Sequence, residues 1–426
     1  MKTLLKNGTV AYGNDLVATD VLFDESGILK IEENIEDEAD DVLDCTNLAV
    51  LPGLIDVHVH LREPGFEAKE TIETGSKAAA RGGFTTIMAM PNVNPYPDNK
   101  ETMEKYLTRI AESSVINVIP YGTITCMEKG EEVSAMKDMK ELGVRWFSDD
   151  GVGVANDEVM EKAMREAAAL DALIASHTED MRFRIPGASV HEAQYAYEHG
   201  WIGIPSDCES SQLTRDLALA LKTQARYHGC HISAMESVEA LRRYKVLGAD
   251  ISAEVTAHHL LLENTDVMGP NWKMNPPLRS HADRMSLIHA LESGVIDFIA
   301  SDHAPHTFED KDKPMAQAAF GIVSLETSFA LLYSEFVKRT HRWTLPQLVS
   351  WMSEKPAKRF GFKDIGVLKP SYKADIVVMD LISERVIHAS QFQSKGKNTP
   401  FDGWTTWATV KRTYVNGKLI YKEGEE

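Results

Sequence analysis

The sequence predicts an α/β protein in which parallel strands alternate with helices, and three observations favour this fold class. Short apolar segments rich in β-branched residues recur through the middle of the chain and are separated by amphipathic helical stretches. About eight such segments occur, the number and order expected of a (β/α)8 TIM barrel. No Gly-x-Gly-x-x-Gly motif follows any of them, which disfavours the second architecture considered, a doubly wound open sheet.

Each predicted strand is an apolar run bounded by polar or turn residues. The strands are expected at Leu54 to Leu61, Phe84 to Met90, Val115 to Ile124, Val144 to Phe147, Leu173 to Ser176, Cys230 to Ser233, Asp250 to Thr256 and Asp297 to Ala300. Two of the intervening helices are predicted over Asp157 to Leu170 and Ser237 to Leu247. Asn156 and Ser237 are the expected N-caps of these helices, because short polar side chains bind the free amides of the first turn.

The two ends of the chain differ from the middle, because short apolar runs alternate there with turn residues. At the N-terminal end the runs are Leu4-Leu5, Val17 to Phe23 and Ile28 to Ile31, with turns predicted at Asn7-Gly8 and Ser26-Gly27. At the other end, Ala374 to Leu381 is a predicted strand, and Asn416-Gly417 predicts a hairpin between Thr413 and Tyr421. One small β domain built from both ends and two separate edge hairpins both fit this pattern.

Composition and charge exclude several classes of protein. The chain has 426 residues, 43% of them apolar and 26% charged, as expected of a globular protein. It carries 45 basic and 64 acidic residues, a net charge of −19, which disfavours binding to nucleic acid or to an anionic membrane. The four cysteines show no CxxC spacing, and no segment has the apolar length of a signal peptide or a membrane span. We therefore expect a cytoplasmic protein, in which a small anionic substrate would need a local positive site.

The pair His58 and His60 gives the first indication of chemistry. Alternate side chains of a strand point to the same side, so the two imidazoles lie next to each other at the end of the first predicted strand. Neutral imidazole is the commonest protein ligand for metals. Such a pair is weak evidence when it stands alone, because two histidines at this spacing also occur by chance.

Further candidate ligands follow other predicted strands. They are Asp150 after the fourth strand, His177 after the fifth, His231 after the sixth and Asp302 after the eighth. Because barrel enzymes place their chemistry at the C-terminal ends of the strands, we expect these side chains to converge with His58 and His60. Such a set of nitrogen and oxygen ligands suits two divalent ions that share a carboxylate, and zinc is the expected metal. His258, His259 and His303 lie out of register with this pattern and are expected either to have structural roles or to support the ligands from behind.

Several longer motifs resemble a known family. Gly53 to His60 resembles the opening motif of the amidohydrolase superfamily. More selective similarities are His58 to Gly65, Met90-Pro91-Asn92, Lys273 to Arg279, Asp302 to His306 and Phe320 to Val323. Together these motifs resemble dihydroorotases of the class I bacterial type over nearly the whole chain.

The resemblance implies a fold, a reaction and roles for individual residues. It implies a metal-dependent (β/α)8 barrel over residues 53–362, and a composite β-sandwich domain from residues 1–52 and 363–426. It implies two zinc ions, one held by His58, His60 and Asp302, the other by His177 and His231, with Asp150 as the bridge. The implied reaction interconverts N-carbamoyl-L-aspartate and (S)-dihydroorotate in pyrimidine biosynthesis, and a homodimer is implied.

Asp302 is the expected catalytic base, because it lies both at the metal and near the substrate. Arg62, two residues beyond His60, faces the same cavity and offers a bidentate fork to the substrate carboxylate. The residues implied to contact the substrate are His60, Arg62, Asn92, Asn275, His306, Phe320 and Gly321.

Three alternatives stay open at this point. A related cyclic amidase, such as a dihydropyrimidinase or an allantoinase, is the second enzyme considered, but its substrate lacks a carboxylate at the position that Arg62 would bind. A metal-free scaffold protein is disfavoured because all six ligands are present. The charged segment Thr307 to Lys313 is either a mobile flap over the site or a solvated loop.

Overall fold

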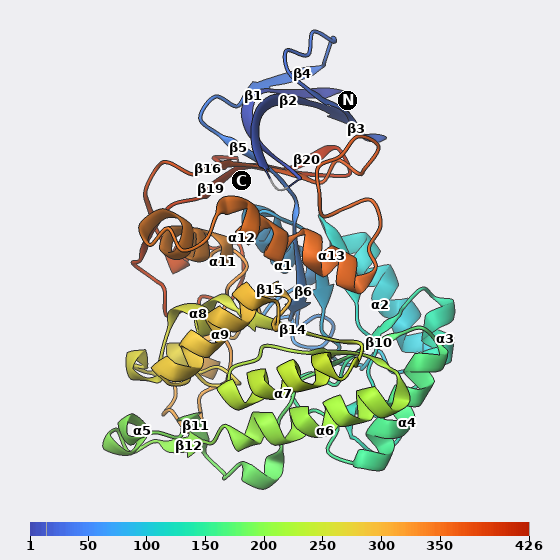
Figure 1. The fold of residues 1–426 in the computed structure, drawn as a ribbon, viewed down its shortest axis with the longest axis vertical. Coiled ribbons are helices and arrows are strands. Elements are labelled where there is room, and N and C mark those ends of the chain that lie inside the picture. Colours follow the sequence, from blue (N-terminus) through green and yellow to red (C-terminus); the bar gives the residue numbers. More distant parts are fainter. Residues whose placement is uncertain (14, 426) are drawn as a thin grey trace.

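In the computed structural model, which describes residues 1–13 and 15–425, pairings and bridges join eight parallel strands from the middle of the chain into a ring. We call them the strand ring: β6 (Leu54–Val59), β7 (Phe84–Ala89), β8 (Asn117–Pro120), β9 (Trp146–Phe147), β10 (Leu173–Ser176), β13 (Arg226–Gly229), β14 (Ile251–Thr256) and β15 (Phe298–Ala300). Their pairings run β6-β7-β8 and β9-β10-β13-β14-β15. Parallel bridges between Gly122 and Phe147, and between Val59 and His303, join the two series. Figure 1 shows four of these strands, β6, β10, β14 and β15, below the strands from the two ends of the chain.

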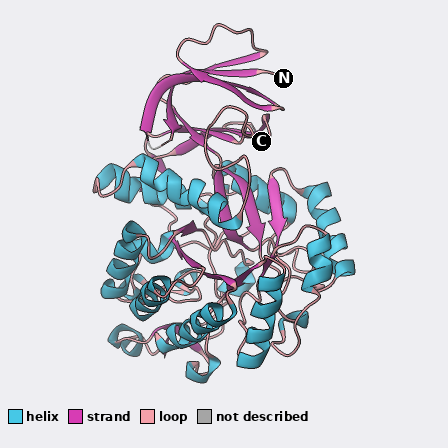
Figure 2. Ribbon diagram, turned by 45° about the vertical axis from the view of Figure 1, so that its right-hand side comes forward, coloured by secondary structure: helices cyan, strands magenta, loops and turns pink. Residues whose placement is uncertain are grey.

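Helices follow the strands and cover the ring, which gives the predicted α/β class (Figure 2). The longer helices are α1 (Ile72–Arg81), α2 (Lys100–Ser113), α3 (Met136–Glu141), α4 (Asp157–Ala169), α6 (Asp207–Thr223), α7 (Met235–Val246), α9 (His281–Ser293), α12 (Leu345–Met352) and α13 (Glu354–Phe360). The shorter ones are α5 (Gln194–Glu198), α8 (Ala257–Leu261), α10 (Phe308–Lys311) and α11 (Ser328–Leu332). None of the helices in the described residues combines the length and apolar character needed to cross a membrane.

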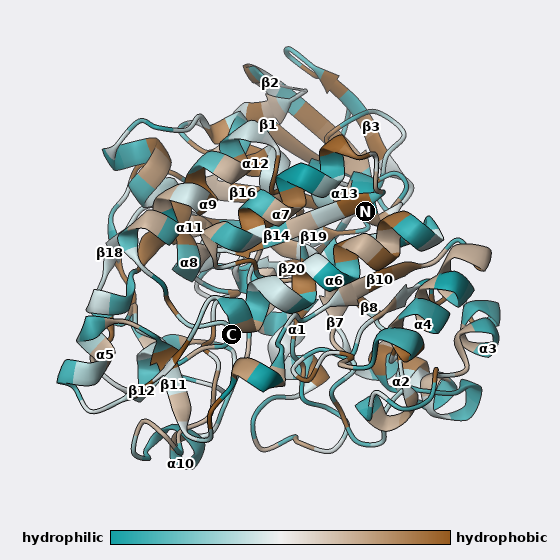
Figure 3. Cartoon of the chain, turned by 60° about the horizontal axis from the view of Figure 1, so that its bottom comes forward, coloured by the Kyte–Doolittle hydropathy of each residue, from teal (hydrophilic) through white to brown (hydrophobic). Residues whose placement is uncertain are grey.

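Helix α4 shows why these segments are helical. Its buried residues are Met160, Ala163, Met164 and Ala167, the spacing that puts apolar side chains on one face. The Asn156 side chain accepts hydrogen bonds from the backbone amides of the first turn, so the predicted N-cap is confirmed. The same two-sided character is visible in Figure 3, where hydrophilic and hydrophobic bands alternate around the outer helices.

Two predicted boundaries are wrong. The sixth strand covers Arg226–Gly229 rather than Cys230 to Ser233, and the prediction missed it because Arg226 and His228 interrupt its apolar pattern. His228 is nevertheless fully buried, because both of its ring nitrogens have hydrogen-bond partners. Ser237 is not an N-cap either: helix α7 begins at Met235, and Ser237 lies buried inside it.

Strands from the two ends of the chain pair in one eight-stranded sheet, which we call the end sheet (Figure 1). Its strands are β1 (Thr3–Tyr12), β2 (Asp15–Asp24), β3 (Gly27–Glu32), β4 (Asp41–Asp44), β5 (Ala49–Pro52), β16 (Ile376–Asp380), β19 (Thr409–Val415) and β20 (Lys418–Lys422). Strand β5 joins the two parts of the chain, because it pairs with both β1 and β16. Phe23, Val50, Ile376 and Tyr414 pack in the buried core of this sheet.

The hairpin predicted at Asn416-Gly417 is confirmed, since both residues have positive φ between the antiparallel strands β19 and β20. The turn predicted at Asn7-Gly8 is wrong, because these residues lie inside β1 at a shift in register. Two short sheets complete the fold, β11 (Ala188–His191) with β12 (Ile202–Ile204) and β17 (Arg385–Val386) with β18 (Thr405–Thr406).

Candidate active site

Asp150 lies at the centre of the predicted histidine ligands. Its Oδ1 is 3.3 Å from His58 Nε2 and 3.7 Å from His231 Nε2. The same oxygen is 3.9 Å from His177 Nδ1, and the other oxygen, Oδ2, is 3.4 Å from His60 Nε2. One carboxylate thus contacts four imidazoles that come from the ends of three different strands, as a bridging ligand would.

Asp302 completes this cluster from the end of β15. Its Oδ1 lies 3.2 Å from His60 Nε2 and 3.6 Å from His58 Nε2. Both Asp302 and His231 have positive φ, 47° and 35°, a conformation that non-glycine residues rarely adopt. Backbone strain of this kind is concentrated at functional sites, where the surrounding structure holds it.

The second ring nitrogen of three of these histidines is held by a polar side chain that orients the first. His58 Nδ1 donates to Glu254 at 2.7 Å, and His60 Nδ1 donates to Asn92 at 3.0 Å. His177 Nε2 donates to Glu179 at 3.1 Å. Each of these imidazoles therefore turns its other ring nitrogen toward Asp150, the arrangement that orients metal-binding histidines in proteins.

Glu254 and Glu179 were not predicted from the sequence. Glu254 is fully buried in β14 and also accepts from His228 Nε2 at 2.9 Å. The signal that could have found it is an ionisable residue in the middle of an apolar strand, since such a group needs a partner to be buried. Glu179 has a weaker signal, its position two residues after His177.

The cluster opens into a cavity of about 640 Å³, a volume that includes the solvent-filled space at its opening. All predicted site residues except His58 line this cavity, and His58 is fully buried behind them. The lining residues are His60, Arg62, Asn92, Asp150, Gly151, His177, His231, Asn275, Asp302, Ala304, His306, Phe320 and Gly321. The structure therefore brings the predicted residues together in one place.

Arg62 and His306 form one wall of the cavity. Arg62 Nε donates to the Pro305 carbonyl at 3.3 Å, and its Nη2 lies 3.4 Å from His306 Nε2. His306 Nε2 donates to the Phe320 carbonyl at 2.8 Å. Burial lowers the pKa of Arg62 to about 10, so the guanidinium still carries its charge at neutral pH.

The surroundings of the cluster shift the pKa values of its acids and imidazoles in different directions. Burial alone raises the pKa of Asp302, but the hydrogen bond from His60 and the charge of His58 outweigh it and hold the pKa below its usual range. Burial lowers the pKa of His60 and of His177. For His58 the nearby carboxylates of Asp150 and Glu254 outweigh burial and raise the pKa. The buried acids thus favour a positive charge at the centre of the cluster.

These residues fit a metal ion. His58 Nε2 and Asp150 Oδ1 are buried and have no hydrogen-bond partner among the described residues, although they face each other. His58, His60 and Asp302 offer ligand atoms that lie within 4.8 Å of one another, and so do His58, Asp150 and His231. Unpaired buried groups of this type are satisfied when they coordinate a cation.

The three other histidines considered in the sequence lie outside this cluster. His303 Nδ1 accepts from the Ser324 amide at 3.1 Å, and His259 Nε2 donates to the Pro276 carbonyl at 3.0 Å. His258 is buried next to His259.

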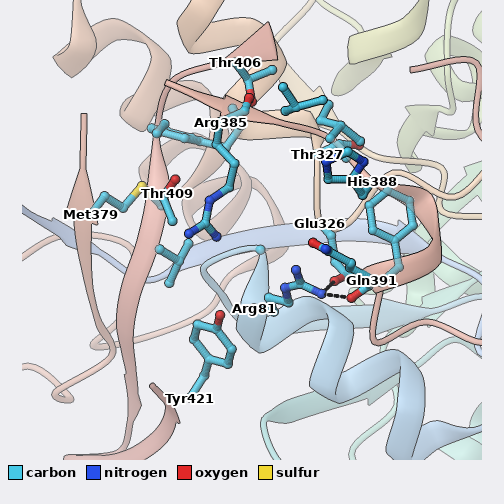
Figure 4. Close-up of a pocket in the computed structure, with 18 residues that line it drawn as sticks. Arg81, Glu326, Thr327, Met379, Arg385, His388, Gln391, Thr406, Thr409 and Tyr421 are labelled. Atoms are coloured by element: carbon cyan, nitrogen blue, oxygen red, sulfur yellow. Dashed lines mark hydrogen bonds and ion pairs between the residues drawn. The ribbon is translucent and has the colours of Figure 1, made fainter. Parts of the chain in front are cut away.

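A second cavity, shown in Figure 4, has a different character. It lies between the end of α1 and the segments around residues 326–330, 385–392 and 406–410, and it contains none of the predicted site residues. Its arginines are already paired, Arg81 with Glu326 at 3.0 Å and Arg385 with Glu423. We therefore assign the chemistry to the cavity at the strand ends.

Comparison with known proteins identifies the family. The profile of a family described as dihydro-orotase-like matches residues 48–237. A dihydroorotase from Geobacillus thermodenitrificans is 50% identical over 429 residues and covers 100% of both chains. A dihydroorotase from Halalkalibacterium halodurans is 48% identical, over 100% of this chain and 99% of its own. The chain belongs to the dihydroorotase family.

Solved structures of related cyclic amidases share the fold. An L-hydantoinase (dihydropyrimidinase) from Arthrobacter aurescens superimposes with a TM-score of 0.89 at 27% identity and covers 99% of this chain and 96% of its own. A dihydropyrimidinase from Brevibacillus agri superimposes with a TM-score of 0.87 at 24% identity, over 100% of this chain and 96% of its own. Members of the dihydroorotase family are hydrolases of cyclic amides, in agreement with the predicted enzyme class.

Proposed function

We propose that the chain interconverts (S)-dihydroorotate and N-carbamoyl-L-aspartate in a site that binds two zinc ions. One observation carries the proposal: six ligand side chains from five strand ends form one cluster at the base of the cavity that Arg62 lines. In this arrangement His58, His60 and Asp302 would hold one ion and His177 and His231 would hold the other, with Asp150 as the ligand that lies next to both groups. Bound zinc would acidify a coordinated water and polarise the scissile carbonyl.

Asp302 is the proton carrier in this proposal. Its Oδ1 faces His58 and His60, so Oδ2 is the oxygen left to exchange a proton with the substrate. In hydrolysis a C–O bond forms at the ring carbonyl and the ring C–N bond breaks. Asp302 takes the proton of the attacking water and gives it to the leaving nitrogen. Because its pKa is held low, Asp302 starts the cycle as a carboxylate.

Arg62, Asn92 and His306 recognise the substrate carboxylate. A guanidinium binds a carboxylate through two parallel hydrogen bonds, and the neighbouring neutral groups complete the site. Asn275, Phe320 and Gly321 face the same cavity and contact the ring. The Gly321 amide already donates to the Lys273 carbonyl at 2.9 Å, so Gly321 acts chiefly through shape.

We propose the domain organisation and the assembly that the family resemblance implies. The closed pairing of the strand ring supports a (β/α)8 barrel over residues 53–362. The joint end sheet supports a composite β-sandwich domain from residues 1–52 and 363–426. We propose a cytoplasmic homodimer that binds neither nucleic acid nor membranes.

Turnover of three cyclic amides tests the function. With zinc supplied, we expect hydrolysis of dihydroorotate to exceed that of dihydrouracil and allantoin by about 10⁴-fold or more, because the neutral rings leave the half-buried Arg62 without its partner. A preference for dihydrouracil or allantoin would favour the related amidases. Absence of both bound metal and turnover would favour a scaffold protein.

A further inference from the structure

The C-terminal segment 391–398 runs from the cavity of Figure 4 to the wall of the active-site cavity. At its start, the Arg81 side chain donates to the Gln391 carbonyl, and buried Glu326 accepts from the amides of Gln393 and Ser394 at 3.0 and 3.1 Å. Further along, Glu70 accepts from the Lys395 amide at 3.1 Å. The segment is therefore fixed along its length before it reaches the active site.

Asn398 is the residue of this segment that contacts the active-site wall. Its Oδ1 accepts from the His306 amide at 3.1 Å. Its Nδ2 donates to the carbonyls of Ala304 and Gly321 at 3.1 and 3.0 Å. The amide is buried, and its oxygen and both of its N–H groups are used, which makes these bonds costly to lose.

Two of these partners, His306 and Gly321, line the substrate cavity. Gly321 has φ +126°, and a Cβ there would lie 2.6 Å from Ala304 Cβ, so only glycine fits this position. Because glycine has no side chain to restrict its backbone, the conformation of Gly321 has to be fixed by hydrogen bonds from polar groups of other residues. Asn398 supplies one such group from a part of the chain 77 residues away.

Lys311 supplies the second group. Its side chain is buried, and its Nζ donates to the carbonyls of Lys273, Ala319 and Gly321 at 3.2, 2.9 and 3.0 Å. The Gly321 carbonyl therefore accepts from both Lys311 and Asn398. Among the described residues no carboxylate lies within 4.0 Å of the Lys311 ammonium, so these carbonyls are its main partners.

We propose that Asn398 and Lys311 are positioning residues that hold His306 and Gly321 in the geometry that binds the substrate carboxylate and ring. The inference rests on the proposed function, because it assumes that this wall contacts dihydroorotate. Within the described residues, neither side chain forms a hydrogen bond with one of the six metal-ligand residues, so their loss should change substrate binding without changing bound metal.

Kinetics of zinc-loaded Asn398→Ala and Lys311→Met enzymes test the proposal. We expect the KM for dihydroorotate to rise about tenfold in each, with kcat within about threefold of the wild type. Metal content per chain should stay the same. The matched controls are Gln393→Ala and Lys313→Met, exposed side chains of the same two segments, and both should keep the wild-type KM.

The double variant sharpens the test. Because both donors bind the same carbonyl, the increase in KM should be smaller than the product of the two single increases. KM values within twofold of the wild type in both single variants would overturn the proposal, as would loss of metal together with kcat. If Asn398→Ala does not fold, Lys311→Met alone decides between these results. Failure of the wild type to turn over dihydroorotate would instead reject the proposed function.

Discussion

The rim of the strand ring, by which we mean the strand ends that carry the six ligands, buries polar and charged side chains, whereas the end sheet buries apolar ones. At the rim, His58, Glu254 and Asp56 are fully buried polar groups, and each is hydrogen-bonded to a group in, or directly after, another strand. In the end sheet, Phe23 and Tyr414 pack edge to face with ring centroids 5.0 Å apart in an apolar core. Apolar burial stabilises a fold directly, whereas buried charges need partners merely to be tolerated. The comparison indicates that the end sheet serves stability and the rim serves chemistry.

The largest expected effect on turnover comes from Asp302→Asn. This change keeps the size of the side chain and removes the carboxylate that carries the proton, so kcat should fall about 10³-fold or more. Metal analysis of the same sample should show that most of the bound metal is kept. Turnover within tenfold of the wild type would show that another group carries the proton.

Glu254→Gln tests whether the buried polar groups behind the ligands matter. The substitution removes the charge that orients His58, and the dissociation constant for zinc should rise about 10- to 100-fold. Glu263→Gln is the matched control, because Glu263 also accepts from a histidine, His281, but on the surface. Equal zinc affinity in both variants would contradict the orienting role.

Arg62→Lys tests the wall of the active-site cavity that Arg62 and His306 form, and its expected effect is smaller. Lysine keeps the positive charge but loses the two-pronged geometry, so the KM for dihydroorotate should rise about tenfold with little change in bound zinc. Arg165→Lys, at an exposed position on α4, should leave the KM unchanged. A KM that Arg62→Lys does not alter would place the carboxylate elsewhere.

The smallest effect on turnover is expected in the end sheet. Phe23→Ala leaves a cavity in its core and should lower the free energy of unfolding by about 3–5 kcal/mol. Turnover per folded, metal-loaded chain should stay at the wild-type value, because no residue of this core lines the active-site cavity. Chemical denaturation and kinetics on the same preparation measure both quantities. A fall in kcat in a sample that is fully folded would show that the end sheet also affects catalysis, and would contradict the separation of the two regions.

Much of the site could be predicted because its ligands follow the ends of recognisable strands. His58 and His177 lie in or directly after an apolar strand, and Asp302 follows one after a single serine; parallel strands bring such positions to one edge. The predictions missed Glu254 and Asn398, whose partners are 196 and 92 residues away and share no local pattern with them. Pairing across such distances depends on tertiary packing. The sixth strand was misplaced for a related reason: His228 is a polar residue that is buried through tertiary hydrogen bonds, so it does not fit the apolar pattern of a buried strand.

The most direct test of the account is the metal content of purified wild-type chain, measured together with turnover before and after removal of metal by a chelator. The account predicts two zinc ions per chain, loss of turnover with the metal, and recovery when zinc is restored, with Asp150→Asn defective in both binding and recovery. Full turnover of a chain that contains no metal would contradict the central claim that the six converging side chains form a metal centre.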